Sequence, residues 1–95
     1  MVKYIVLFKL KDPNDAEAVA NVLHTMEGKI DGLLSMETGV NRWPREGRCY
    51  DLALTILFRD WESVDRYDVD PLHQECRKFI YPRRADGKTV AYEVE

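Results

Sequence analysis

Residues 50–58, Tyr50-Asp51-Leu52-Ala53-Leu54-Thr55-Ile56-Leu57-Phe58, form a predicted strand with apolar side chains on both faces. Side chains alternate between the two faces of a strand. One face carries Leu52, Leu54, Ile56 and Phe58, and the other carries Asp51, Ala53, Thr55 and Leu57. Both faces therefore need cover. Because two helical regions cover only one face of a sheet, we expect the more apolar face to pack against a second copy of the chain.

The sequence before this strand predicts two more strands and a helix. Residues 2–10 alternate and are apolar on both faces in the middle, which is typical of a central strand. Asp12-Pro13 predicts the start of a long amphipathic helix that ends at Gly32. Residues 33–42 predict a half-exposed strand, and residues 43–48 predict a hairpin loop rich in turn residues and charge.

The sequence after residue 58 predicts a broken helix and a last strand. Asp60 begins a short helix, Asp70-Pro71 begins a second, and Pro82 ends it. Residues 88–95 alternate again and follow Gly87. The order is strand, helix, two strands, broken helix, strand. It predicts a single α+β domain over residues 1–95, with a ferredoxin-like βαββαβ topology and a four-stranded antiparallel sheet.

Right-handed crossovers place both helical regions on one side of such a sheet and leave the other side bare. Two bare faces packed together would form a dimeric α/β barrel, so we expect a homodimer. The predicted dimer interface consists of Ile5, Leu7, Leu52, Leu54, Ile56, Phe58, Val90, Tyr92 and Val94.

Composition narrows the partners and the compartment. The net charge of −3 argues against a polyanion as the main partner, and the third strand lacks the basic and glycine positions of an RNA-binding sheet. No stretch approaches the ~18 apolar residues of a membrane span, so we expect no membrane partner and a cytoplasmic location. Cys49 and Cys76 lack a CxxC motif or a histidine at ligand spacing, so no metal site is expected.

Chemistry-bearing side chains gather around the predicted helix break. Asp70-Pro71 interrupts the helix, so Tyr67 and His73 can converge over the helix-facing side of the sheet. His73 near a helix N-terminus favours the neutral imidazole, the form that accepts a proton. On the alternative interpretation, both residues have structural roles. Tyr67 then fills the core from the apolar stripe of its helix, and His73 is a surface or capping residue. The predicted ligand pocket is lined by Tyr4, Val6, Phe8, Asp51, Ala53 and Thr55.

The sequence also resembles a known family. Residues 2–11, 28–34 and 50–54 and the segment Tyr67-Asp68-Val69-Asp70-Pro71-Leu72-His73 are similar to the stress-responsive A/B barrel (Dabb) domain over essentially the whole chain. The resemblance implies a homodimer of ferredoxin-like units packed sheet to sheet. In cyclase members, a tyrosine and a histidine on this helical segment act as acid and base, and they correspond to Tyr67 and His73. Other histidines of the family pattern are replaced here by Tyr4, Asp51 and Asp70.

Two classes of function follow from these observations. The first is a non-catalytic homodimer of uncharacterised role that binds a small aromatic or polyketide-like ligand. The alternative is a cofactor-independent cyclase, lyase or monooxygenase-like enzyme, with His73 as general base and Tyr67 as oxyanion stabiliser. No cofactor is expected, although His24 and His73 are the two histidines that a haem iron would have available. The sequence leaves open whether the protein is an enzyme.

Overall fold

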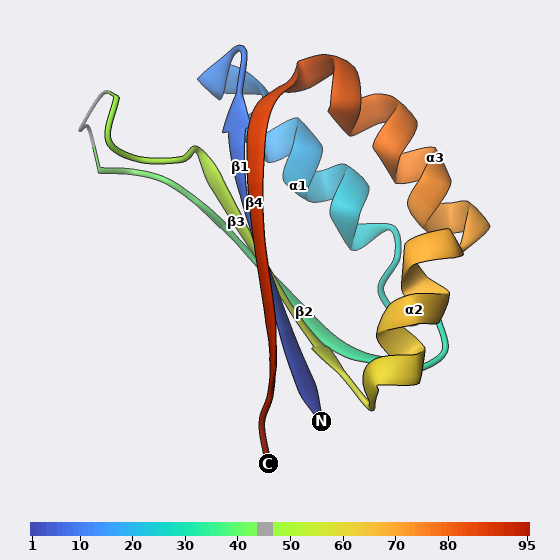
Figure 1. Ribbon diagram of the computed structural model, residues 1–95. Helices are drawn as coiled ribbons and strands as arrows, with labels where there is room; N and C mark the ends of the chain where they lie inside the picture. The colour runs from blue at the N-terminus through green and yellow to red at the C-terminus, as the bar shows by residue number, and fades with distance from the viewer. Residues whose placement is uncertain (44–46) are drawn as a thin grey trace.

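The computed structural model describes residues 1–43 and 47–95 and contains one four-stranded sheet with helices on one side (Figure 1). The elements are β1 Val2–Leu10, α1 Ala16–His24, β2 Leu33–Val40, β3 Leu52–Phe58, α2 Trp61–Val69, α3 Pro71–Ile80 and β4 Arg84–Glu93, with 3-10 turns at Pro13–Asp15 and Tyr81–Arg83. The strand order is β2-β3-β1-β4, and every neighbouring pair is antiparallel. The predicted ferredoxin-like α+β fold is therefore confirmed. Residues 44–46 of the predicted hairpin loop lie outside the described residues.

Pairing between β1 and β3 decides which face of the sheet is the core. Val6 pairs with Leu54 and Phe8 with Leu52, and directly paired side chains lie on the same face of an antiparallel sheet. The even-numbered residues of both strands thus share the face that α1, α2 and α3 cover (Figure 1). The core side chains contributed by β1 and β3 are Val2, Val6, Phe8, Leu10, Leu52, Leu54, Ile56 and Phe58.

This register corrects the predicted dimer interface. Leu52, Leu54, Ile56 and Phe58 are each at most 1% exposed within a single chain, so their assignment to an intermolecular surface is wrong. Alternation identified the two faces of β3 correctly, but the more apolar face is the one that the chain's own helices cover. Since burial inside one subunit removes this face from water, no partner is needed for it.

The uncovered side of the sheet, here called the open face, is still apolar at its centre. Ile5 pairs with Val90, and Lys3 pairs with both Leu57 and Tyr92, which places these side chains together. The apolar members of the open face are Ile5, Leu7, Ala53, Leu57, Val90 and Tyr92. Leu7, Val90 and Tyr92 are 39%, 53% and 43% exposed. Four of the predicted interface residues thus lie on this face, and Val94 lines a hollow on it with Lys3 and Leu57. Their contact with a second chain stays a prediction.

Two elements differ from their predicted bounds. The helix that follows Asp12 ends at His24, and the chain then runs in turns to β2, although Met26 and Ile30 remain buried as the apolar spacing indicated. β4 starts at Arg84, before Gly87, because Leu10 of β1 extends the ladder beyond the glycine. Within residues 1–43 and 47–95, no helix combines the length and apolarity that crossing a membrane requires.

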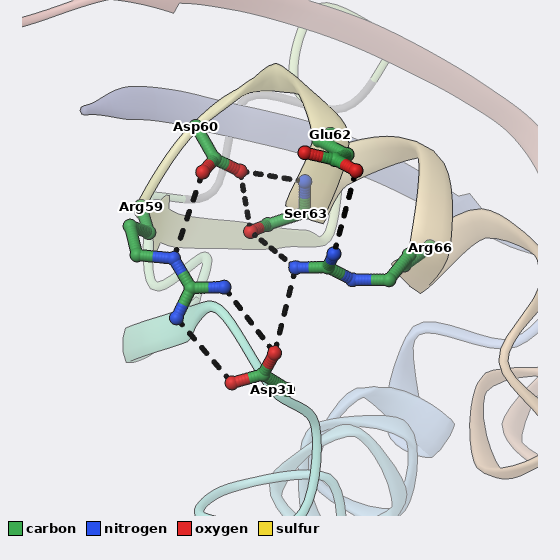
Figure 2. Close-up of polar contacts among 6 residues, drawn as sticks. All are labelled: Asp31, Arg59, Asp60, Glu62, Ser63 and Arg66. Atoms are coloured by element: carbon green, nitrogen blue, oxygen red, sulfur yellow. Dashed lines mark hydrogen bonds and ion pairs between the residues drawn. The ribbon is translucent and has the colours of Figure 1, made fainter.

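A polar cluster fastens the segment after α1 to the start of α2 (Figure 2). The Asp60 carboxylate caps α2 by accepting hydrogen bonds from the Ser63 backbone N–H at 2.8 Å and from the Ser63 hydroxyl at 2.6 Å. Arg59 donates to both carboxylate oxygens of Asp31, at 3.3 and 3.2 Å. Arg66 donates to Ser63 Oγ at 3.1 Å and lies 3.5 Å from Asp31. The cluster joins two segments that are separated in the sequence by β2 and β3.

Gly32 is the close contact at the centre of this junction. Its φ is +86°, and its carbonyl accepts a hydrogen bond from the Arg59 N–H at 2.9 Å. A Cβ at this position would lie 2.1 Å from Ser63 Oγ and 2.4 Å from Ser63 Cβ. Ser63 is fully buried and cannot move aside easily. Position 32 therefore requires glycine for its conformation and for the space it leaves.

We predict that Gly32→Ala destabilises the protein well beyond Gly28→Ala. Gly28 also has a positive φ, +72°, but a Cβ there would meet no atom within 4 Å. Both variants carry the penalty of a left-handed backbone, and Gly32→Ala adds overpacking that costs about 1–3 kcal/mol. Urea denaturation at one fixed protein concentration measures the difference. Equal losses of unfolding free energy in the two variants would contradict the close contact.

Candidate functional site

Asp70-Pro71 breaks the helical segment and shapes the site. Asp70 has an extended backbone, with φ −63° and ψ 133°, and its side chain caps α3 by accepting a hydrogen bond from Leu72 N at 2.8 Å. The residue before a proline avoids the helical region, and a proline has no N–H to continue the helix. The chain therefore turns sharply between α2 and α3, which brings His73 back toward Tyr67.

The turn determines which ring nitrogen of His73 carries a proton. His73 Nδ1 lies 3.0 Å from the Tyr67 carbonyl oxygen and 3.4 Å from that of Asp68. A carbonyl oxygen accepts and does not donate, so Nδ1 carries the hydrogen and Nε2 keeps a lone pair in the neutral ring. The imidazole also stacks on the Tyr67 ring, with centroids 4.0 Å apart and planes 21° apart.

Tyr67 is held from the other side by aromatic rings of the sheet. Its ring centroid lies 5.7 Å from that of Tyr4 and 5.1 Å from that of Phe58. Tyr4 and Phe58 make an edge contact with each other at 5.8 Å. Such tilted and edge-to-face pairs are the favourable geometries for aromatic side chains. The Tyr67 phenol therefore has a fixed position between α3 and the sheet.

A cavity of about 110 Å³ opens beside these rings. It lies between the sheet and α3, it is partly open to solvent, and His73 and Tyr67 are among the residues that line it. An apolar cavity of ~150 Å³ accommodates benzene. The cavity therefore suits a molecule of about six non-hydrogen atoms or fewer, which is smaller than the polyketide-like ligand that the sequence suggested.

Two polar atoms of the lining are free to meet a ligand. Among the described residues, neither the Tyr67 hydroxyl nor His73 Nε2 forms a hydrogen bond with the protein. Every fully buried side-chain nitrogen or oxygen of the described residues has a hydrogen-bond partner. Because these two atoms have none, they must be accessible to solvent, and the cavity that both residues line provides that access. One is a hydrogen-bond donor and the other an acceptor.

Burial keeps both groups uncharged at neutral pH. It raises the pKa of the Tyr67 phenol strongly, and the neighbouring Tyr4 raises that pKa further. Burial lowers the pKa of His73, and the positive charge of Arg77 lowers that pKa again. Loss of hydration disfavours the charged form of each group, the phenolate of tyrosine and the imidazolium of histidine. The site thus offers a neutral phenol and a neutral imidazole, the pairing that acid–base chemistry uses.

The structure brings together five of the predicted site residues. Tyr4, Val6, Phe8, Tyr67 and His73 all line the cavity. What they bind or catalyse stays a prediction.

Three residues of the predicted pocket are placed wrongly. Ala53 pairs with Leu7 and Thr55 with Ile5, so both lie on the open face. Asp51 is buried before β3, where its carboxylate accepts a hydrogen bond from the Leu10 N–H at 2.8 Å and so has a structural role.

Sequence reasoning missed Arg77, Tyr81 and Arg84, which also line the cavity. Arg77 is four residues after His73 on α3, and that spacing places two side chains on one helix face. The same spacing extends to Tyr81 at the end of α3. Arg84 gave no local signal, because it reaches the cavity only through the pairing of β4 with β1.

His24, the other histidine, is not part of this cavity. It lies on α1, where its Nδ1 pairs with Glu27 and its Nε2 lies 2.8 Å from the Thr38 hydroxyl. No group of three or more metal-ligating side chains occurs in residues 1–43 and 47–95. Both cysteines are free.

The fold and the cavity together define a ferredoxin-like domain with a small polar site between its helices and its sheet. More particularly, the chain belongs to the stress responsive A/B barrel domain family, Dabb, whose model matches residues 2–95. A search of curated proteins gave no match.

Solved structures with the same fold cover almost the whole chain. A dimeric protein of unknown function and ferredoxin-like fold from Bacteroides fragilis is 29% identical, with a TM-score of 0.82 and coverage of 98% of this chain and 95% of that one. A dimeric ferredoxin-like protein of unknown function from Thermobifida fusca is 24% identical, with a TM-score of 0.84 and coverage of 98% and 90%. The hydroxynitrile lyase from Passiflora edulis is 13% identical, with a TM-score of 0.82 and coverage of 99% and 93%, and its similarity concerns the fold alone.

Proposed function

We propose that this protein is a homodimer in which each subunit binds a small polar molecule in the cavity that Tyr67 and His73 line. The observation that carries the proposal is the pair of unpartnered groups in one cavity, a phenol that donates and an imidazole nitrogen that accepts. Both atoms reach solvent, so a ligand that displaces water from the cavity must replace the hydrogen bonds of the phenol and of the imidazole nitrogen, and a ligand with matching groups does so. The aromatic and aliphatic walls supply the apolar contact that ligand pockets use.

The open face supports the homodimer. Its centre is apolar and partly exposed, which in a soluble domain marks an interaction surface. Two similar proteins, those from Bacteroides fragilis and Thermobifida fusca, are described as dimeric. A second copy would present the same surface across a two-fold axis, so the two apolar centres would meet. The cavity lies on the other side of the sheet, so dimer formation leaves it accessible.

A second candidate function is cofactor-independent proton transfer on the bound molecule. His73 Nε2 would take a proton from the ligand, and the Tyr67 hydroxyl would donate a hydrogen bond to the oxyanion that develops. The Nδ1–H bond to the Tyr67 carbonyl favours this role because it points the basic nitrogen at the cavity. The lyase from Passiflora edulis has the same fold and lends this candidate general support.

The binding proposal predicts that small hydroxy or carbonyl compounds raise the melting temperature. In a panel of compounds with about six non-hydrogen atoms or fewer, at least one should stabilise the wild type, and the stabilisation should grow with the logarithm of its concentration once that concentration exceeds the dissociation constant. Tyr67→Phe keeps the ring packing but removes the donor, and should weaken that compound about tenfold. Tyr92→Phe makes the same change on the open face and should bind like the wild type.

A panel without any stabilising compound, or equal binding by Tyr67→Phe, would contradict the proposal. Product formation in the same mixtures, followed by NMR, separates the two candidate functions. Turnover that His73→Gln abolishes while binding persists identifies the enzyme, and binding without turnover identifies the binding protein.

The dimer proposal predicts that wild-type protein sediments at twice the 11.1 kDa chain mass at micromolar concentration. Val90→Glu places a carboxylate in the centre of the open face, which should produce monomers because an unpaired charge is costly to bury. Val69→Glu is the control, since Val69 is 71% exposed at the end of α2 and should leave the dimer intact. Monomeric wild type, or a dimeric Val90→Glu variant, would contradict an interface on this face.

A further inference from the structure

Two arginines flank one aromatic ring beside the cavity. The guanidinium carbon of Arg84 lies 4.6 Å from the centre of the Tyr81 ring, and that of Arg77 lies 5.8 Å from it. All three residues line the same cavity as Tyr67 and His73, and Tyr81 is 49% exposed, which places it at the opening. We call Arg77, Tyr81 and Arg84 the cationic rim. Both of its positive charges thus lie within 5.8 Å of the centre of one ring.

The rim keeps a positive charge that no carboxylate of the described residues neutralises. Arg77 forms an ion pair with Asp68, with Nη2 and Oδ1 2.9 Å apart. Arg84 forms none with the described carboxylates. Like charges repel one another, so an anion that contacts both guanidinium groups would reduce the repulsion and form charge-assisted hydrogen bonds.

Arg84 is packed into place and does not extend freely into solvent. Gly87 pairs with Phe8 and therefore faces the helices. A Cβ at Gly87 would lie 2.8 Å from Arg84 Nη1 and 3.5 Å from Arg84 Cδ, so the arginine occupies the space that a larger residue would need. The residue is largely buried, with only a minor part of its surface exposed. Less side-chain entropy remains to be lost when a ligand binds an arginine that is already confined.

The electrostatic effect of the rim extends into the cavity. The positive charge of Arg77 lowers the pKa of Tyr67, against the larger effect of burial, and it also lowers the pKa of His73. It lowers the pKa of Tyr4 as well, although burial and then the negative charge of Asp68 raise that pKa by more. In each case the charge favours the more negative state of the group. A ligand that carries negative charge into the cavity would benefit in the same way.

We infer that the cavity takes a short organic acid with a hydroxyl or carbonyl group, whose carboxylate binds between Arg77 and Arg84. The inference rests on the proposed ligand-binding function and names its substrate class. The hydroxyl of such an acid donates to His73 Nε2 and accepts from the Tyr67 hydroxyl, so it satisfies both free atoms. An acid of about six non-hydrogen atoms also matches a cavity of about 110 Å³.

Three related probes test this inference on the full-length protein. Lactate carries the hydroxyl and the carboxylate, lactamide carries the hydroxyl without the charge, and propionate carries the charge without the hydroxyl. We expect Arg84→Gln to weaken lactate and propionate about tenfold, because a charge-assisted contact is lost, and to leave lactamide unchanged. Dissociation constants come from NMR titrations at constant ionic strength and pH.

Arg83→Gln is the control because it makes the same charge change one residue away. Arg83 donates to the Phe79 carbonyl at 2.8 Å, stacks on the Phe79 ring, and does not line the cavity. It should bind all three probes like the wild type. A second variant, Gly87→Ala, keeps both charges but displaces the Arg84 guanidinium, and should weaken the two acids without affecting lactamide.

The possible failures are distinguishable. If lactamide binds as tightly as lactate and Arg84→Gln has no effect, the rim does not select acids, while ligand binding at Tyr67 and His73 stands. If Arg83→Gln weakens the acids as much as Arg84→Gln, the effect comes from net charge and the inference is wrong. If none of the three probes binds at tens of millimolar or below, the inference that the cavity takes short hydroxy acids is wrong. If no compound of the larger panel raises the melting temperature either, the proposed ligand-binding function is wrong as well.

Discussion

The antiparallel register of β1 with β3 is the constraint on which the rest of the structure depends. It places the even-numbered residues of both strands on one face, so that Val6 and Leu54 meet under the helices. One consequence is a core that a single chain completes, with Ile56 and Phe58 fully buried. A second consequence is the position of Tyr4 on the helix-facing side of the sheet, where its ring packs against the ring of Tyr67. The third is the open face, whose smaller apolar surface remains for a partner.

The helix break converts this scaffold into a site. A continuous helix would direct the side chains of residues 67 and 73 about 120° apart around its axis. The turn at Asp70-Pro71 instead lets His73 donate a hydrogen bond to the backbone of the preceding helix and stack on the ring of Tyr67. The same contact orients the imidazole, fixes its tautomer and leaves its basic nitrogen toward the cavity. The backbone turn and the arrangement proposed for proton transfer therefore have one cause in this protein.

Much of this architecture follows from local sequence patterns. The order of elements, the aspartate caps and the Asp70-Pro71 break depend on residues that are adjacent in the chain, and these predictions agree with the structure. The covered face of β3 does not follow from β3 alone, since both of its faces are apolar. It follows from pairing with β1, whose even-numbered residues add Val6 and Phe8 to the same side. Arg84 reaches the cavity through the pairing of β4 and through the space at Gly87, which are contacts between distant parts of the chain.

The most direct test of the central claim is the protonation state of the His73 ring, read from its ¹⁵N chemical shifts as a function of pH. We predict a neutral ring at pH 7 with the hydrogen on Nδ1 and none on Nε2. The ring should become protonated at a lower pH than an ordinary histidine, because burial lowers the pKa of His73. A ring with its hydrogen on Nε2, or an imidazolium at pH 7, would contradict this arrangement of the site, since the cavity would then lack its hydrogen-bond acceptor.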